Sequence, residues 1–164
     1  MSTQGEGLYF PFAMKLNQDL GHFDISTVRL PPLPEVGSLS FGELSVPVNY
    51  LLDYDDPEDP DLSVEHPAEY LLTGDQRSIL IVVHASVPSN YREIVLFHEL
   101  IEAELVLERR CPPPVAHRIA RASEFMYARR VLVSDEFAMY RAWRDKLGDT
   151  SQPLSEMVGK TELA

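Results

Sequence analysis

The stretch that decides the fold is SILIVVHASVPSNYREIVLFHELIEAEL, residues 78–105. Its opening is rich in β-branched residues and almost continuously apolar, so residues 77–85 predict a strand buried on both faces. Ser89, which follows Pro88, is a suitable N-cap for a helix over about residues 90–110. The stretch therefore predicts a buried strand, a short loop and a long helix, in that order.

Two more helices are expected downstream. The CPPP sequence at residues 111–114 ends the first helix, and a second begins near Pro114 because proline is tolerated in a first helical turn. That helix should end around Leu132. Ser134 then caps a third helix, which stops at Gly148. Because the three-proline link is short, the first two helices should be antiparallel.

The chain before residue 77 is richer in proline. Residues 42–54 have strand character, and Pro47 suggests an edge strand. The AEYLLTGD segment, residues 68–75, fits either a strand or a helical turn. In residues 1–40 aromatic residues are mixed with prolines, which predicts an irregular arm with short strands at most.

These elements predict one α+β domain over residues 41–148, in which a small sheet is followed by three helices. The irregular arm over residues 1–40 precedes it, and a flexible polar tail over residues 149–164 follows it. Within the arm, RLPPLP at residues 29–34 either packs on the domain or is a ligand for a proline-recognising partner.

Composition narrows the class of protein. The chain has 164 residues, 45% apolar and 24% charged, as in ordinary globular domains. Cys111 is the only cysteine, which excludes an internal disulfide and cysteine-based zinc fingers and fits a reducing cytoplasm. The N-terminus lacks a signal-peptide pattern, and the longest apolar run, residues 79–83, is too short to cross a bilayer. We therefore expect a soluble cytoplasmic protein with no membrane partner.

Charge is unevenly distributed along the chain. The formal net charge is −12; residues 53–69 carry eight acids and no base, whereas residues 109–146 carry nine bases and four acids. Because an acidic chain repels nucleic acid, we expect no nucleic-acid partner. The two segments are either solvated surfaces or contact surfaces for a protein partner.

His98 and Glu102 fall on the inward side of the first helix. On a helical wheel they lie in a narrow gap in the apolar face, whereas Glu104 falls outside the apolar stripe. An unpaired carboxylate in a buried place costs several kcal/mol or becomes protonated. A divalent cation would compensate Glu102 and use the neighbouring imidazole. The stripe consists of Ile94, Phe97, Ile101 and Leu105.

The second helix offers complementary groups, His117 and Glu124, seven residues apart and nearly in line. Antiparallel packing places Glu124 opposite His98 and Glu102, and His117 closer to the turn. The predicted metal ligands are therefore His98, Glu102 and Glu124, with His117 either a fourth ligand or an orienting neighbour. Imidazole with carboxylates suits zinc first, and also manganese or iron(II).

The same residues have an interpretation without a metal. Glu102 could pair with Arg121 or Arg118, and His98 could donate to a backbone carbonyl, which would make the site a buried polar cluster.

Residues 78–105 resemble the active-site segment of compact zincin metallopeptidases of the ImmA/IrrE type. The strand, the short loop with an arginine entering the helix, and the His98-Glu99 pair all have counterparts there. The resemblance implies a zincin-like fold, with Glu99 as the general base that activates metal-bound water. It also implies a third ligand on the next helix, which Glu124 matches. These enzymes have a histidine at the position of Glu102.

A wider pattern, HExxE followed by AHRIARASE, resembles an HExxE…AHxxAxxxE motif of small bacterial and phage proteins without an assigned activity. Together the two resemblances cover roughly residues 77–132.

The function we expect is that of a metal-dependent hydrolase, first of all a metallopeptidase acting on a peptide or protein. Tyr127, one turn after Glu124, is a candidate for a second catalytic role, because its hydroxyl could stabilise an oxyanion. A carboxylate in place of an imidazole makes the metal less electrophilic, which lowers the expected activity. The alternative is a non-catalytic zincin-like module that binds a metal or a protein partner.

Three further histidines are weaker candidates. His84 ends the predicted strand and is either a core residue or a residue of a substrate cleft, and His22 and His66 are expected at the surface. The chain has no G-x-S-x-G sequence and no glycine-rich phosphate loop, which argues against serine hydrolases and nucleotide-binding enzymes.

Overall fold

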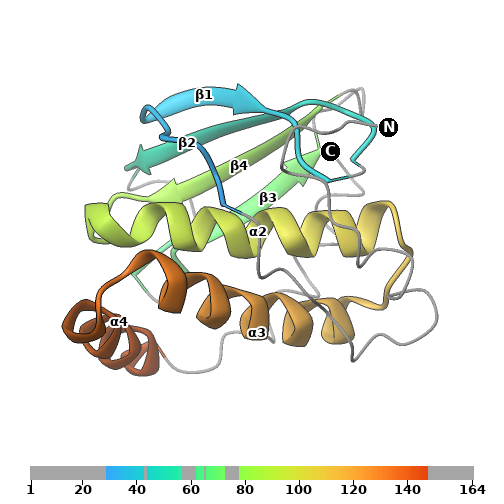
Figure 1. Cartoon of the computed structure of the whole chain (residues 1–164). Helices are drawn as coiled ribbons and strands as arrows, with labels where there is room; N and C mark the ends of the chain where they lie inside the picture. The colour runs from blue at the N-terminus through green and yellow to red at the C-terminus, as the bar shows by residue number, and fades with distance from the viewer. Residues whose placement is uncertain (1–28, 43, 57–61, 65, 73–77, 148–164) are drawn as a thin grey trace.

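A computed structural model of the chain describes residues 29–42, 44–56, 62–64, 66–72 and 78–147. These residues form a four-stranded sheet, one short 3-10 turn and three α-helices (Figure 1). The elements in chain order are β1 (Val36–Leu39), β2 (Val48–Tyr54), β3 (Ala68–Leu72), β4 (Ile79–His84), η1 (Ser89–Tyr91), α2 (Arg92–Leu107), α3 (Pro113–Val131) and α4 (Ser134–Lys146). The predicted α+β class is confirmed.

The sheet is mixed, with strand order β1-β2-β4-β3. β2 and β4 are parallel, and the outer strands β1 and β3 are antiparallel to their neighbours. The predicted buried strand is therefore an interior one, and Ile79, Ile81 and Val83 are fully buried. The edge position suggested for Pro47 is wrong. β2 begins one residue later, and the Pro47 carbonyl accepts a 3.0 Å hydrogen bond from the Ile79 N–H.

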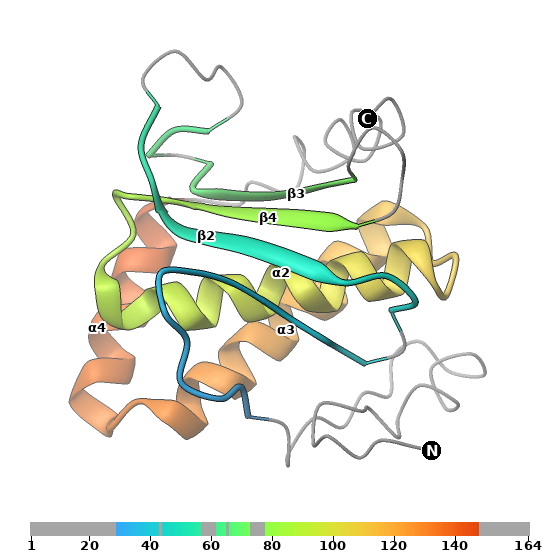
Figure 2. The ribbon, with the colours of Figure 1, turned by 90° about the horizontal axis from the view of Figure 1, so that it is seen from above.

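The molecule is layered, with the sheet on α2 and α2 on α3 (Figures 1 and 2). α2 packs against β4, β3 and β2 on one side and, most extensively, against α3 on the other. The two helices run antiparallel, as the three-proline link predicts. α4 contacts α3 and lies at the end of the layers where α2 begins.

α2 is buried on nearly every side, because all twelve residues from Ile94 to Leu105 are buried. The expectation that Glu104 lies outside the apolar face is wrong, since its exposed fraction is 3%. The chain after β1 crosses this side of the helix. A Cβ atom at Gly42, which has a φ of +54°, would collide with the Glu104 carboxylate. Glycine thus allows the backbone to approach the helix closely.

The helix ends differ from prediction in detail. Ser89 is the first residue of η1, whose N-cap is Pro88, and the N-cap of α2 is Tyr91, so Ser89 caps neither element. α2 ends at Leu107 rather than near Arg110, because Arg110 adopts a left-handed φ of 57°. The Cys111 N–H then donates to the Leu105 carbonyl at 2.9 Å, which closes the helix end.

The predicted arm contains ordered structure. β1 lies within residues 1–40, and Leu30 is buried in the core, where its N–H donates to the Tyr127 hydroxyl at 2.9 Å. At Leu30, therefore, RLPPLP packs on the domain. Residues 1–28 and 148–164 lie outside the described residues, so the rest of the arm and the tail are predictions only.

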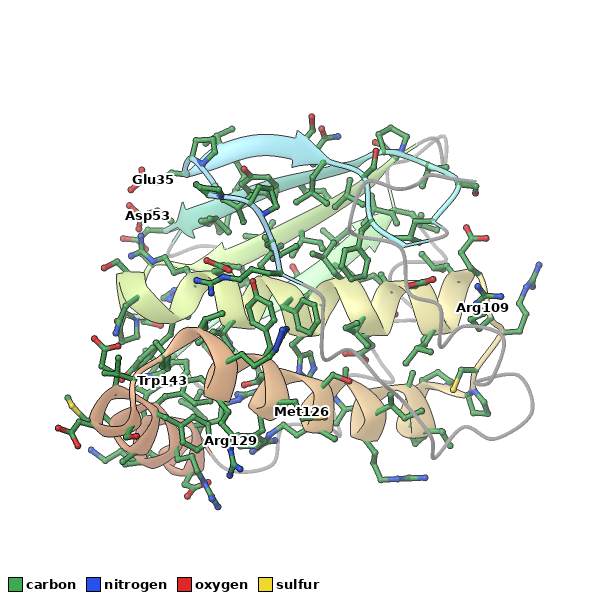
Figure 3. All side chains as sticks on the ribbon, viewed as in Figure 1. Glu35, Asp53, Arg109, Met126, Arg129 and Trp143 are labelled. Atoms are coloured by element: carbon green, nitrogen blue, oxygen red, sulfur yellow. The ribbon has the colours of Figure 1, made fainter. Side chains whose placement is uncertain are left out.

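The exposed charges of the described residues lie on different sides of the domain. Glu35 and Asp53 lie beside the sheet, whereas Arg129 lies on the side of α3 that faces away from it (Figure 3). Among the helices that the structure describes, none is long and apolar enough to cross a membrane.

Candidate metal centre

Three side chains from α2 and α3 bring potential metal ligands together. They are His98, Glu102 and His117, and one ligand atom of each lies within 4.8 Å of the other two. The Glu102 Oε1 atom is 3.2 Å from His98 Nε2 and 3.8 Å from His117 Nδ1. The two imidazole centroids are 5.1 Å apart. We call these three residues the donor group.

Local helix geometry places the donor group. His98 and Glu102 are one turn apart on α2, so their side chains lie on the same face. His117 stands in the second turn of α3, close to the proline link, where the antiparallel helix passes the C-terminal half of α2. The exposed fractions of the three side chains are 3%, 0% and 5% in chain order. The two helices therefore hold the group away from solvent.

Glu102 is poorly compensated. Neither of its oxygens accepts an aligned hydrogen bond within the described part of the chain, and His98 Nε2 approaches Oε1 at 3.2 Å. Among the described residues its ion contacts are with His98 and His117, and neither Arg121 nor Arg118 pairs with it. The alternative in which an arginine neutralises Glu102 is wrong.

Glu124 is placed differently from the prediction that made it a ligand. It lies on the other side of the His98 ring, where its Oε1 is 2.7 Å from Nδ1. Its two oxygens also accept hydrogen bonds from Arg144, at 2.8 Å from Nε and 3.2 Å from Nη2. The structure therefore brings His117, rather than Glu124, into the donor group.

Arg144 is the functional candidate that the sequence did not reveal. It lies on α4, which carries no part of the recognised pattern, and it is buried. The sequence held one signal: Tyr140 and Arg144 are four residues apart, so an aromatic residue and an arginine share one face of α4, and the structure buries both. An arginine on the buried side of a short helix indicates a buried acid elsewhere.

The ionisable groups around His98 have strongly shifted pKa values. Burial lowers the pKa of His98, but the carboxylates of Glu102 and Glu124 outweigh it and raise the pKa to about 9. Burial raises the pKa of Glu124, but Arg144 and His98 more than offset this and lower it to about 2. Without a metal, a protonated His98 therefore lies between the carboxylates of Glu102 and Glu124.

Glu99, the predicted general base, adjoins the donor group on α2. Its exposed fraction is 6%, and its Oε1 accepts no hydrogen bond among the described residues. Burial, followed by the charge of Glu102, raises its pKa to about 8. The Glu99 carboxyl is thus close enough to the donor group for the charge of Glu102 to raise its pKa.

Tyr127, the other predicted catalytic residue, is occupied away from the donor group. Its hydroxyl donates a short hydrogen bond to Glu93 and accepts one from the Leu30 N–H. Its ring stacks on Phe97, with centroids 4.2 Å apart. Burial and the bond to Glu93 raise the pKa of the hydroxyl. The Tyr127 hydroxyl is therefore engaged by Glu93 and Leu30 and not by the donor group.

The remaining histidines lie apart from this site. His84 is half-buried at the end of β4, and its Nδ1 atom accepts a 3.0 Å hydrogen bond from the Ser86 N–H. It thus bonds the turn that follows β4 and is not a core residue. His66 is half-buried as well, and its N–H bonds Ser63. The prediction for His22 falls outside the described residues.

Comparison with known proteins adds no family. No protein-family model matches the chain, and neither curated proteins nor solved structures show a significant similarity to it. The zincin-like assignment therefore stays a prediction from residues 78–105.

Proposed function

We propose that this protein binds one divalent metal ion through His98, Glu102 and His117 and is a metal-dependent hydrolase. The observation that carries the proposal is the state of Glu102, a fully buried carboxylate whose ion contacts among the described residues are with two imidazoles only. A metal ion would compensate this charge and use all three side chains as ligands.

The donor set favours zinc. Two imidazoles and one carboxylate form a common ligand set of catalytic zinc sites, and the same set suits iron(II) and manganese. Thiolate is missing from the donor group, which argues against the closed cysteine-rich sites that hold structural zinc.

Catalysis needs a base next to the metal. A divalent ion with three protein ligands keeps a position for water and lowers the pKa of that water. Glu99 follows His98 directly and is not used as a ligand, so its carboxylate is the group that would accept the proton. A peptide or protein is the substrate class, as the resemblance of residues 78–105 to zincin peptidases implies.

The burial of the site favours a second candidate, a non-catalytic metal site. None of the donor side chains, nor Glu99, is more than 6% exposed, so a substrate could reach them only if neighbouring segments moved. In that case the metal would join α2 to α3 and stabilise the fold.

Metal analysis combined with one substitution separates these functions. We expect purified protein to hold about one zinc per chain, and Glu99→Ala to keep the metal but lose cleavage of an unfolded protein substrate, followed by mass spectrometry of the products. Metal retention with no cleavage by the wild-type protein would favour the non-catalytic site. Absence of bound metal from the wild-type protein, even after zinc is added, would refute both.

A further inference from the structure

We propose that Glu124 and Arg144 are positioning residues that turn Nε2 of His98 toward the metal, and that Glu124 is not itself a ligand. The inference rests on the proposed metal site and specifies its composition. The metal ligands are then two histidines and one carboxylate, whereas the sequence predicted one histidine and two carboxylates.

The hydrogen bonds of Glu124 already use both of its oxygens. Oε2 accepts from Arg144 Nε at 2.8 Å, and Oε1 accepts from both Arg144 Nη2 and His98 Nδ1. A guanidinium that donates hydrogen bonds to both oxygens of a carboxylate holds it in one orientation. To reach a metal in the donor group, Glu124 would have to give up at least one of these charge-assisted bonds.

The contact with Glu124 also decides which nitrogen of His98 is free. An ionised carboxylate can only accept, so the 2.7 Å contact places the ring proton on Nδ1. In the neutral imidazole the lone pair is then on Nε2, the nitrogen that lies 3.2 Å from Glu102. Carboxylates that fix a ligating histidine in this way also raise its basicity.

Arg144 is held in place by the packing of α4. Tyr140, one turn earlier, is fully buried and lies edge-on to Tyr91, with ring centroids 5.2 Å apart. Trp143, near the C-terminal end of α4, packs on the same ring of Tyr91, also at 5.2 Å (Figure 3). These aromatic contacts dock α4 against the start of α2. The last helix therefore supplies a cation to the site without contacting the metal.

Cobalt(II) is a suitable probe, because its absorption spectrum reports the number and type of ligands. We expect His117→Ala and Glu102→Gln to lose tight cobalt binding. Glu124→Gln should keep one cobalt per chain with the wild-type spectrum and an affinity lowered by about 10–100-fold. Arg144→Ala should act in the same direction, with rescue by Arg144→Lys. Lys146→Ala, which removes an exposed cation from the same helix, should change nothing.

The wild-type protein provides a test that does not depend on the folding of a variant. X-ray absorption of the cobalt form should count two imidazoles, and ring-nitrogen NMR of the zinc form should show His98 bound through Nε2 with a proton on Nδ1. One imidazole, or His117→Ala that keeps the metal while Glu124→Gln loses it, would overturn the inference and leave the metal site standing. Absence of cobalt binding by the wild-type protein would instead refute the proposed function, and the inference with it.

Discussion

The two carboxylates that flank His98 differ in how the protein compensates them. Glu102 and Glu124 are equally buried, and each approaches one ring nitrogen of the same histidine. Glu124 also has a guanidinium from α4, whereas in the part of the chain that the structure describes Glu102 has ion contacts with imidazoles only. The difference indicates which buried charge the polypeptide neutralises by itself and which one it leaves for a proton or a metal ion.

The largest effect should follow from removing the cation of the compensated carboxylate. Arg144→Ala leaves Glu124 buried with only His98 beside it, which should cost about 3–5 kcal/mol of unfolding free energy in the metal-free protein. Urea denaturation at pH 7 measures this, with Lys146→Ala as the control within about 0.5 kcal/mol of wild type. An equal loss in both variants would show that Glu124 does not depend on Arg144.

The next effect is a pH dependence of the metal-free protein. The folded state raises the pKa of Glu99 to about 8 and that of His98 to about 9, so folding retains protons that the unfolded chain releases near pH 4.5 and 6.5. The free energy of unfolding should therefore fall by several kcal/mol as pH rises from about 5 to 9. Saturating zinc, which displaces the proton from Nε2 of His98, should reduce the fall.

Glu124 should produce the opposite trend in acid. Its pKa of about 2 lies below the ordinary value of 4.5. The stabilisation that ionised Glu124 gives to the folded state is therefore complete above pH 4.5 and is lost as pH falls toward 2. Thermal denaturation of the metal-free protein between about pH 2 and 4.5 and between about pH 5 and 9 measures both trends. Stability of the metal-free protein that rises with pH between 5 and 9 would contradict the charge states given to His98 and Glu99.

A smaller effect is expected at the buried Tyr127 hydroxyl, which lies outside the site. Tyr127→Phe removes the hydroxyl that bonds Glu93 and Leu30, which should cost about 1–2 kcal/mol of stability. Zinc affinity should stay unchanged, because the hydroxyl does not belong to the donor group. Titration calorimetry and denaturation of the same variant give both values. Loss of hydrolytic activity at wild-type zinc affinity would return Tyr127 to a catalytic role.

Much of α2 could be predicted because its helical period is fixed. Residues 98 and 102 lie one turn apart whatever surrounds them, so their inward orientation followed from the apolar stripe alone. The burial of Glu104 did not follow, because it depends on a loop at Gly42 that approaches from a distant part of the sequence. Periodicity describes one face of a helix, and α2 has neighbours on the others.

The exchange of roles between His117 and Glu124 has the same origin. Both residues were expected on the inner side of α3, and both are buried there. Which of them contacts Glu102 depends on how far the two antiparallel helices are shifted along each other, and on Arg144 of α4, which donates hydrogen bonds to Glu124. Neither the offset nor the distant partner is encoded in the spacing of a single helix.

Zinc titration of the metal-free protein, compared between wild type and Glu102→Gln, tests the central claim most directly. Because Glu102 has no guanidinium beside it among the described residues and shares His98 with Glu124, the account predicts about one tight zinc site per wild-type chain, and a loss of at least about 100-fold in affinity in the variant. Equal zinc affinity in the two proteins, or no zinc binding by the folded wild-type chain, would contradict it.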